Sequence, residues 1–332
     1  MNKYKYLKYV HKLQQLGFGL YCDAHINTTL IQNINRQYEY KLQFGLADGS
    51  VVKFAFDPTG NRILLGKGTF GEIYKGIYHK MNATNDTEIV IKEMDVRTVH
   101  SHIMFCEEIT TMIEYNNPYA VKYYGFAFAC GRYYIFMEFL HGKELHYFAR
   151  NNLLTPEHKK YIAYHLIMGL KEMHRNGIAH RDIKLENIML DIDNTNTIQS
   201  IKYIDFGFSC KKDINCDYSN VAKGTPAYIA PEIWKRTYET PPNVSNMFDD
   251  VFQFIDMWAL GSTLFTLFTG SYLSESNHPQ IIISSADDQY ITNIIDKYKL
   301  LIPSEFVNVL LNLLKINPKE RRMYTPEELA KM

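Results

Sequence analysis

The chain has 332 residues, a formal net charge of zero, 46% hydrophobic residues and 22% charged residues. Such a composition is ordinary for a soluble globular protein, and the length is typical of two lobes rather than a single core. A net charge of zero gives no electrostatic reason to expect a nucleic-acid partner or a membrane-surface partner. Because no run of residues is apolar enough to span a bilayer, we expect no membrane span.

The five cysteines are scattered along the chain and include no Cys-x-x-Cys pair. This pattern argues against a disulfide framework or a zinc site and favours a reducing environment. The basic N-terminus is not followed by the uninterrupted apolar run of a secretory signal. We therefore expect an intracellular protein, most simply a cytoplasmic one. Cys210 and Cys216 could form a redox pair, but two unrelated cysteines are the simpler interpretation.

Residues 1–60 are expected to form an N-terminal extension of unknown role. Between Tyr4 and Leu16, apolar residues recur at helical spacing with lysines between them, which predicts a short amphipathic helix. Its apolar stripe either packs on the rest of the protein, which is the favoured interpretation, or docks on a membrane surface or a partner. The alternating runs 41–46 and 51–56 flank an Asp-Gly turn and predict a β-hairpin.

The turn at 57–60 is the expected boundary, and a Gly-x-Gly-x-x-Gly run follows at Gly66–Gly71. This spacing alone is a weak signal, because dinucleotide-binding folds share it. In those folds the glycines open a helix, whereas here the flanks 62–65 and 72–77 are strand-like. A glycine-rich hairpin lets backbone N–H groups approach phosphates where a Cβ would collide. The context therefore favours a phosphate-covering hairpin.

Two strands and a helix are predicted between residues 88 and 174. Residues 88–92 alternate as a strand that ends in Lys92, and residues 133–140 form a second strand that runs into Gly142. A helix is expected from Pro156 through His174, because the preceding Thr155 suits the N-cap and proline suits the first turn.

The run His180-Arg181-Asp182-Ile183-Lys184-Leu185-Glu186-Asn187 is followed downstream by Asp205-Phe206-Gly207. An Asp that can accept a proton and an Asn that can hold a metal share one short loop, and a second Asp comes on the next turn. This spacing suits phosphoryl transfer, which needs an oriented hydroxyl, metal ions that bridge phosphates and fixed positive charge. Two ordinary solvated turns would be the alternative.

Taken together and in this order, these stretches resemble the eukaryotic-type protein kinase family, of the serine/threonine-specific kind. The resemblance covers about residues 62–332 and departs from the usual pattern at Ile183, where Leu is common, and at Val90, where Ala is common. It implies an α+β bilobal fold, with a small antiparallel β-sheet lobe over 61–139 and a mainly α-helical large lobe over 140–332.

The resemblance also implies catalytic roles for residues on both lobes. Asp182 would accept or orient the proton of the substrate hydroxyl, and Lys184 would neutralise charge on the transferred phosphoryl group. Asn187 and Asp205 would hold Mg²⁺. Lys92 would contact the α- and β-phosphates of ATP.

The ion-pair partner of Lys92 is expected on the helix that follows. Glu107, Glu108 and Glu114 compete for this role, and the family's spacing from helix to proline favours Glu108, with Glu107 as the alternative.

The hinge of the family would lie at 133–140, where the backbone of Glu138 and Leu140 would bind adenine. The residues expected to bind ATP are Leu65, Gly66, Lys67, Gly68, Thr69, Phe70, Gly71, Ile73, Val90, Lys92, Met137, Glu138, Leu140 and Met189. Structural roles are implied for Asp256, which would support the catalytic loop, and for Arg321, which would pair with Glu232. His180 is expected to be a packed structural histidine.

The segment between Asp205 and Glu232 resembles the activation segment of the family. Its end, 224–232, resembles the peptide-docking loop of serine/threonine kinases. This loop, together with Lys184 two residues after Asp182, favours Ser or Thr of a protein substrate as the acceptor.

Arg181 beside the base suggests control by phosphorylation, so an activating kinase is a possible partner. The candidate phosphosites are Ser209, Tyr218, Ser219 and Thr225, of which Ser219 is preferred.

Two rival functions stay open at this stage. A pseudokinase or nucleotide-binding scaffold predicts decay at Lys92, Asp182, Asn187 or Asp205, and all four are intact. A kinase of small metabolites is disfavoured by the peptide-docking loop. Glu144 and Glu186 occupy places where some family members read basic residues near the acceptor, although Glu144 could contact ribose and Glu186 could be solvated.

Overall fold

The computed structural model describes residues 43–46, 48–68, 71–95, 99–129, 131–211, 226–233, 251–273 and 287–331. The chain divides into two compact units, the first made of residues up to 117 with 121–139, the second of 118–120 with residues from 140 onward. Among the described residues, no helix is long and apolar enough to cross a membrane. The amphipathic helix predicted between residues 4 and 16 lies outside the described part of the chain.

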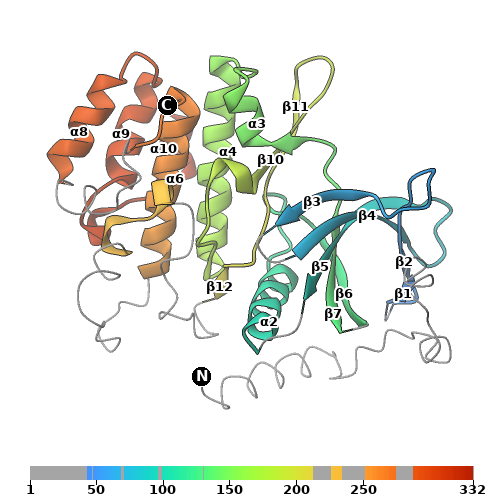
Figure 1. The fold of residues 1–332 in the computed structure, drawn as a ribbon. Helices are drawn as coiled ribbons and strands as arrows, with labels where there is room; N and C mark the ends of the chain where they lie inside the picture. The colour runs from blue at the N-terminus through green and yellow to red at the C-terminus, as the bar shows by residue number, and fades with distance from the viewer. Residues whose placement is uncertain are drawn as a thin grey trace. The chain divides into compact units, whose positions relative to one another are not determined.

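The first unit is a seven-stranded antiparallel sheet with helix α2 (Val99–Glu114) packed against β6 (Figure 1). The strands run in the order β1-β2-β4-β5-β7-β6, and β3 pairs with the same edge of β4 as β2 does. Their bounds are β1 (Gln43–Gly45), β2 (Val51–Phe54), β3 (Leu64–Gly68), β4 (Gly71–His79), β5 (Thr87–Asp95), β6 (Tyr123–Ala129) and β7 (Arg132–Glu138).

The predicted hairpin is formed by β1 and β2, which pair with Gln43 opposite Lys53. Its turn uses Gly49 at φ +80°, a left-handed conformation that glycine adopts without strain, and Asp48 Oδ1 accepts the N–H of Ser50 at 2.9 Å. Strand β2 in turn pairs with β4. The hairpin is therefore hydrogen-bonded into the same sheet as the strands that follow it.

The sheet of the first unit curls so that its first strand packs over distant strands. The ring of Phe44 in β1 lies 4.8 Å from that of Tyr134 and 5.2 Å from that of Phe136, both in β7. The side chain of Leu46, just after β1, faces Gly125 in β6. The enclosed core consists of Phe44, Val52, Phe54, Tyr78, Ile89, Ile91, Ala127, Ala129, Tyr134 and Phe136. The hairpin thus contributes three of its aromatic or branched apolar side chains to the core of this unit.

The second unit is mainly helical (Figure 1). Its helices are α3 (Leu145–Arg150), α4 (Pro156–Arg175), α6 (Val251–Thr269), α8 (Asp288–Lys297), α9 (Ser304–Leu313) and α10 (Pro326–Ala330), with short 3-10 helices η3 (Leu185–Asn187), η6 (Pro226–Tyr228) and η8 (Pro318–Glu320). Small strands complete it: β8 (Lys143–Glu144), β9 (Ile178–Ala179), β10 (Ile188–Ile192), β11 (Ile198–Tyr203) and β12 (Cys210–Lys211). An antiparallel-sheet unit and a helical unit confirm the predicted fold class.

Helices α4 and α6 pack together at the centre of the second unit. Helix α4 begins where the sequence predicts, because Thr155 Oγ1 accepts the N–H of His158 at 3.2 Å and Pro156 takes the first helical position. Helix α6 is apolar on most of its surface, and Leu264 and Phe265 are fully buried. These two helices form the frame on which the loops of the second unit are fixed.

A buried ion pair ties the end of the second unit to its middle. Arg321 donates from Nη1 and Nη2 to the two oxygens of Glu232 at 2.6 and 2.7 Å, and its guanidinium lies 5.1 Å from the ring centroid of Trp258. This two-pronged geometry is the strong form of the arginine–carboxylate contact. The predicted pairing of Arg321 with Glu232 is confirmed.

The cysteine prediction needs one correction. Cys210, in β12, is disulfide-bonded. The simpler expectation, that the cysteines are unrelated and unpaired, is therefore wrong for Cys210. Scattered cysteines with no spacing motif could not reveal this, because a disulfide depends on the separation of the Cα atoms in the fold.

Replacement of Phe44 by Ala should lower the free energy of unfolding of the first unit by about 3–5 kcal/mol, because it empties a fully buried site between three aromatic rings. Chemical denaturation followed by circular dichroism measures the change. The matched control is Phe56→Ala, which removes a ring that is 39% exposed and should cost under about 1 kcal/mol. Equal losses in the two variants would contradict the packing described for the hairpin.

Candidate active site

The loop between β9 and β10 is fixed by a carboxylate on another element, helix α6. Asp256 is fully buried, and its two oxygens accept the backbone N–H groups of His180 and Arg181, each at 2.7 Å. The same carboxylate receives His174 Nε2 at 3.0 Å. A buried carboxylate with these partners holds the loop backbone firmly. The predicted supporting role of Asp256 is confirmed.

Three predicted site residues meet within this loop. The Oδ2 atom of Asp182 accepts Lys184 Nζ at 2.8 Å and Asn187 Nδ2 at 2.7 Å. Asn187 Nδ2 also donates to the backbone oxygen of Asp182 at 2.9 Å. Because Asp182 is nearly buried and held through one oxygen, its carboxylate has a defined orientation. The amide nitrogen of Asn187 is used in this contact, so its side-chain oxygen is the atom suited to a metal.

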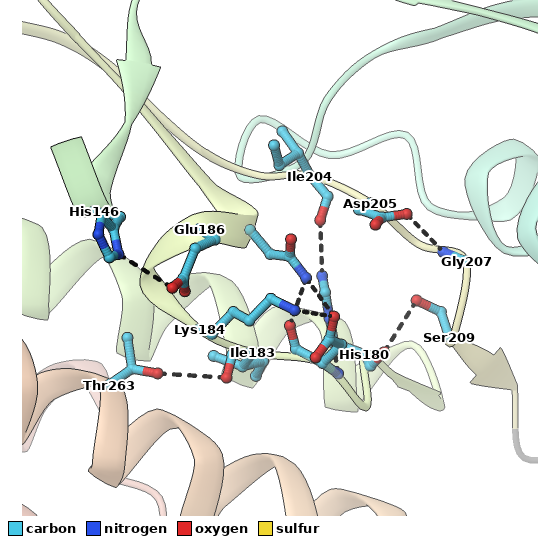
Figure 2. Close-up of polar contacts among 12 residues, drawn as sticks. His146, His180, Ile183, Lys184, Glu186, Ile204, Asp205, Gly207, Ser209 and Thr263 are labelled. Carbon is cyan, nitrogen blue, oxygen red and sulfur yellow. Dashed lines mark hydrogen bonds and ion pairs between the residues drawn. The ribbon is translucent and has the colours of Figure 1, made fainter. Parts of the chain in front are cut away.

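Asp205 follows directly on the same frame. The N–H of Ile204 donates to the backbone oxygen of Asn187 at 3.0 Å, which joins the two metal-site candidates through the backbone. Asp205 adopts φ +60°, and its Oδ1 lies 3.4 Å from the N–H of Gly207 (Figure 2). A left-handed conformation is uncommon outside glycine, and its strain is typical of functional turns.

His180 is a structural histidine, as predicted. Its ring lies 5.1 Å from the ring of the buried Phe206, and Nε2 approaches the backbone oxygen of Ile204 at 3.2 Å (Figure 2). The hydroxyl of Ser209 approaches the backbone oxygen of His180 at 3.4 Å and Ser209 is fully buried. Burial makes Ser209 unsuitable as a phosphosite, while the other candidates, 218, 219 and 225, lie outside the described residues.

The donor set of this loop fits Mg²⁺ chemically. An Asp carboxylate and an Asn oxygen are hard oxygen donors, and Mg²⁺ in phosphoryl transfer takes one or two carboxylates together with substrate phosphates. Within the described ranges, no group of three or more His, Cys, Asp or Glu side chains is arranged to hold a metal ion.

Lys92 and Glu108 form a buried ion pair in the first unit. Lys92 Nζ lies 2.6 Å from Glu108 Oε1, and the two side chains are 7% and 1% exposed. Glu107, the alternative, is only half-buried. The structure therefore pairs Lys92 with the residue that the spacing favoured. Burial strengthens this contact, because water screens it poorly.

The glycine run forms a hairpin between two strands, as its flanks predict. Gly68 of β3 lies opposite Gly71 of β4, while Thr69 and Phe70 lie outside the described residues. A Cβ atom at Gly71 would collide with the backbone oxygen of Glu93, so only glycine fits there. Lys67 Nζ lies 2.7 Å from Glu72 Oε1 across the hairpin.

The residues predicted to form the hinge lie at the end of β7. Met137 is buried and pairs with Val90 of β5. The N–H of Glu138 already donates to the backbone oxygen of Lys122 at 2.8 Å. The N–H of Glu138 is therefore already used in a contact within the first unit. Met189, expected to line the same site, lies in β10 opposite Glu144.

Acidic side chains gather beside the catalytic loop. His146 Nδ1 lies 3.1 Å from Glu186 Oε1 (Figure 2). Although Glu144 lies at the surface, the protein around its carboxylate raises its pKa, and the nearby charge of Glu186 adds to the effect. Burial also raises the pKa of Tyr228, with a contribution from Glu186. The negative charge of Glu186 thus contributes to raising the pKa of both groups.

Sequence reasoning named Glu144 and Glu186 but missed their neighbours. His146 sits on the first turn of α3, two residues after Glu144, and this proximity was the only available signal. Thr263 Oγ1, on α6, lies 3.5 Å from the backbone oxygen of Ile183 (Figure 2). This contact joins residues 80 apart in sequence, so no local pattern could reveal it.

A model of the family described as "Protein kinase domain" matches residues 61–331. The match covers most of the chain and contains every motif described above. The chain belongs to the protein kinase family.

Curated relatives of this protein kinase carry kinase names. It is 31% identical over 62% of its length to "Probable serine/threonine-protein kinase 2" of Plasmodium falciparum and covers 36% of that protein. It is 27% identical over 79% of its length to "Serine/threonine-protein kinase shk1/pak1" of Schizosaccharomyces pombe, covering 36% of it. The corresponding values for "Serine/threonine-protein kinase pakH" of Dictyostelium discoideum are 31%, 64% and 38%. The chain thus spans little more than a third of the length of these relatives.

Replacement of Glu186 by Gln should lower the pKa of Glu144, because it removes a nearby negative charge that favours the protonated form. A carbon-detected NMR titration of the glutamate carboxyl groups measures this shift. The control, Glu172→Gln, removes a carboxylate whose partners are Arg175 and Asn176 and should leave Glu144 unchanged. An identical titration of Glu144 in wild type and Glu186→Gln would contradict the charge coupling.

Proposed function

We propose that this chain is an ATP-dependent serine/threonine protein kinase that transfers the γ-phosphoryl group of Mg-ATP to hydroxyl groups of proteins. The observation that carries the proposal is the arrangement at Asp182, where Lys184 and Asn187 both bind one carboxylate oxygen. Family membership supplies the reaction type. The names of the three relatives support Ser or Thr as the acceptor.

In this proposal Asp182 orients the acceptor hydroxyl and takes up its proton. Its Oδ2 atom is held by Lys184 and Asn187, which supports the use of the remaining oxygen for the hydroxyl. Lys184 then places a positive charge near the transferred group. Such fixed charges stabilise a phosphoryl-transfer transition state more than its ground state.

Asn187 and Asp205 are the residues proposed to hold Mg²⁺, and the backbone bond between Ile204 and Asn187 supports their joint use. Mg²⁺ held there would supply positive charge to offset the negative charge of the nucleotide phosphates. In the first unit, Lys92 would contact the α- and β-phosphates while Glu108 holds its ammonium group. The proposed nucleotide contacts are Leu65, Gly66, Lys67, Gly68, Thr69, Phe70, Gly71, Ile73, Val90, Lys92, Met137, Glu138, Leu140 and Met189.

The remaining parts of the proposal concern organisation and control. Residues 61–332 would form the kinase domain and 1–60 an extension of it, in an intracellular protein. An activating kinase would act on the segment 205–232, with Ser219 as the preferred site. Arg181, whose guanidinium lies 4.6 Å from the ring centroid of Phe252, would bind the added phosphate.

A scaffold without chemistry is the second function that the sequence left open. It predicts the loss of at least one catalytic group. Lys92, Asp182, Asn187 and Asp205 are all present, and the contacts of Lys92 with Glu108 and of Asp182 with Lys184 and Asn187 support a catalytic arrangement. No observation favours the scaffold.

The decisive assay is the transfer of radiolabelled phosphate from ATP to a mixed protein substrate in the presence of Mg²⁺, followed by acid hydrolysis of the product. We expect label on phosphoserine or phosphothreonine with wild type and none with Asp205→Ala. Nucleotide binding without transfer, even after treatment with activating kinases, would support the scaffold instead. Label on phosphotyrosine alone would contradict the acceptor class.

Replacement of Asp182 by Asn should lower kcat by about 10²–10⁴-fold, because the amide keeps the shape of the carboxylate but cannot take up a proton. ATP affinity should change little, since Asp182 acts on the acceptor. Steady-state kinetics measures both quantities. The matched control is Asp296→Asn, an exposed position on α8 that should keep full activity. A kcat within threefold of wild type for Asp182→Asn would remove Asp182 from the mechanism.

A further inference from the structure

Two neighbouring residues of β5 carry buried charges on opposite faces of the sheet. Lys92 points to the face where Glu108 of α2 binds it at 2.6 Å. Glu93 points to the other face, which it shares with Ile89 and Ile91 of the enclosed core, because side chains alternate along a strand. Glu93 is only 4% exposed. A charge buried there needs partners that hold it in place.

Two arginines from other parts of the first unit bind Glu93. Arg62 Nη1 donates to Glu93 Oε2 at 3.0 Å, and Arg132 Nη1 donates to Glu93 Oε1. Each carboxylate oxygen therefore has its own guanidinium, one from Arg62, two residues before β3, and the other from Arg132 at the start of β7. Removal of one partner from such a buried group leaves a charge uncompensated, so the three side chains depend on one another.

The N-terminal hairpin contacts this cluster of Glu93, Arg62 and Arg132 through Phe54. The guanidinium of Arg62 lies 4.1 Å from the ring centroid of Phe54, the last residue of β2, and 5.8 Å from that of Tyr74. The rings of Phe54 and Tyr74 meet edge to face, with centroids 5.5 Å apart. An aromatic face attracts a guanidinium, the more so where water is excluded. Phe54 lies outside residues 61–331, which match the family, so this support is an addition to the matched domain.

The backbone of Glu93 contacts the glycine-rich hairpin as well. A Cβ at Gly71 would collide with the backbone oxygen of Glu93, so the last glycine of the run rests directly on this residue. Glu93 thus adjoins Lys92 along the chain and Gly71 across the sheet. Any shift of Glu93 would move both groups that are proposed to contact the phosphates of ATP.

We propose that Glu93 is a positioning residue for the nucleotide, held by Arg62 and Arg132 and supported by Phe54 of the N-terminal hairpin. The ion pairs of Glu93 with the two arginines fix the end of β5. This keeps the Lys92 ammonium group in contact with Glu108 and keeps Gly71 packed against β5. This inference rests on the proposed function, because it gives Lys92 and the glycine-rich hairpin their roles toward ATP.

The test compares Glu93→Gln with Glu88→Gln as the matched control. Glu88 lies on the same strand as Glu93, and its substitution breaks a partly exposed ion pair with Lys75 of β4. Three quantities are measured well below the unfolding temperature: the rate at which a lysine-reactive acyl-phosphate analogue of ATP labels Lys92, the KM for ATP, and kcat. The labelling is read by peptide mass spectrometry and does not require catalysis. Thermal unfolding gives the fraction of folded protein.

For Glu93→Gln we expect labelling of Lys92 to slow and the KM for ATP to rise, each by about tenfold, as is typical when a residue that orients a binding group is lost. The value of kcat at saturating ATP should change less. Glu88→Gln should match wild type in all three. If Glu93→Gln does not fold, Phe54→Leu carries the test, since it keeps apolar bulk and removes the ring beneath Arg62; it should move the same quantities in the same direction.

A fall in unfolding temperature with unchanged labelling and KM in the folded protein would overturn the inference and leave the cluster with a purely structural role. That result would not affect the proposed function, since wild type would still label and transfer phosphate. Wild type that neither labels at Lys92 nor transfers phosphate would overturn both.

Discussion

The buried carboxylate of Asp256 is the contact on which the catalytic loop depends. A fully buried charge is costly without partners, and here the partners are the backbone N–H groups of His180 and Arg181. The dependence is mutual. The loop N–H groups stabilise the buried carboxylate, and the carboxylate holds the backbone of the loop in place. Since Asp256 stands on α6, whose apolar residues are buried, the packing of the helical core determines where Asp182 points.

The first unit uses the same principle on a strand. Lys92 and Glu93 place opposite charges on the two faces of β5, and each is buried against its own partners. Exposed pairs in this unit, such as Lys67 with Glu72, are screened by water and contribute little to stability. The position of this end of β5 is therefore fixed mainly by the ion pairs of the buried residues Lys92 and Glu93, one on each face of the strand. The exposed ion pairs add little to it.

The sequence predicted much of the site and its support by Asp256, but not the support of Lys92 through Glu93. The partner of Lys92, the loop of Asp182 and the cap at Thr155 were predictable, because each depends on short motifs whose chemistry repeats at fixed intervals. The pairing of Glu93 with Arg62 and Arg132 was not predictable, because it joins residues 31 and 39 positions apart in the sequence. A pairing of Cys210 was considered from the sequence but disfavoured, for a similar reason. Charges and sulfur atoms can be counted in a sequence, but their separation is a property of the fold.

The hairpin of β1 and β2 has a practical consequence for how this kinase is cut into fragments. Sequence similarity places the start of the domain at residue 61, yet the core of the first unit includes Phe44, Val52 and Phe54. A fragment that begins at 61 would strip these side chains from Tyr134 and Phe136 and leave the part of β4 from Gly76 to His79 without its partner on one edge. Exposed aromatic surface beside an open strand edge favours self-association. The boundary of shared ancestry and the boundary of the soluble folding unit therefore fall at different residues.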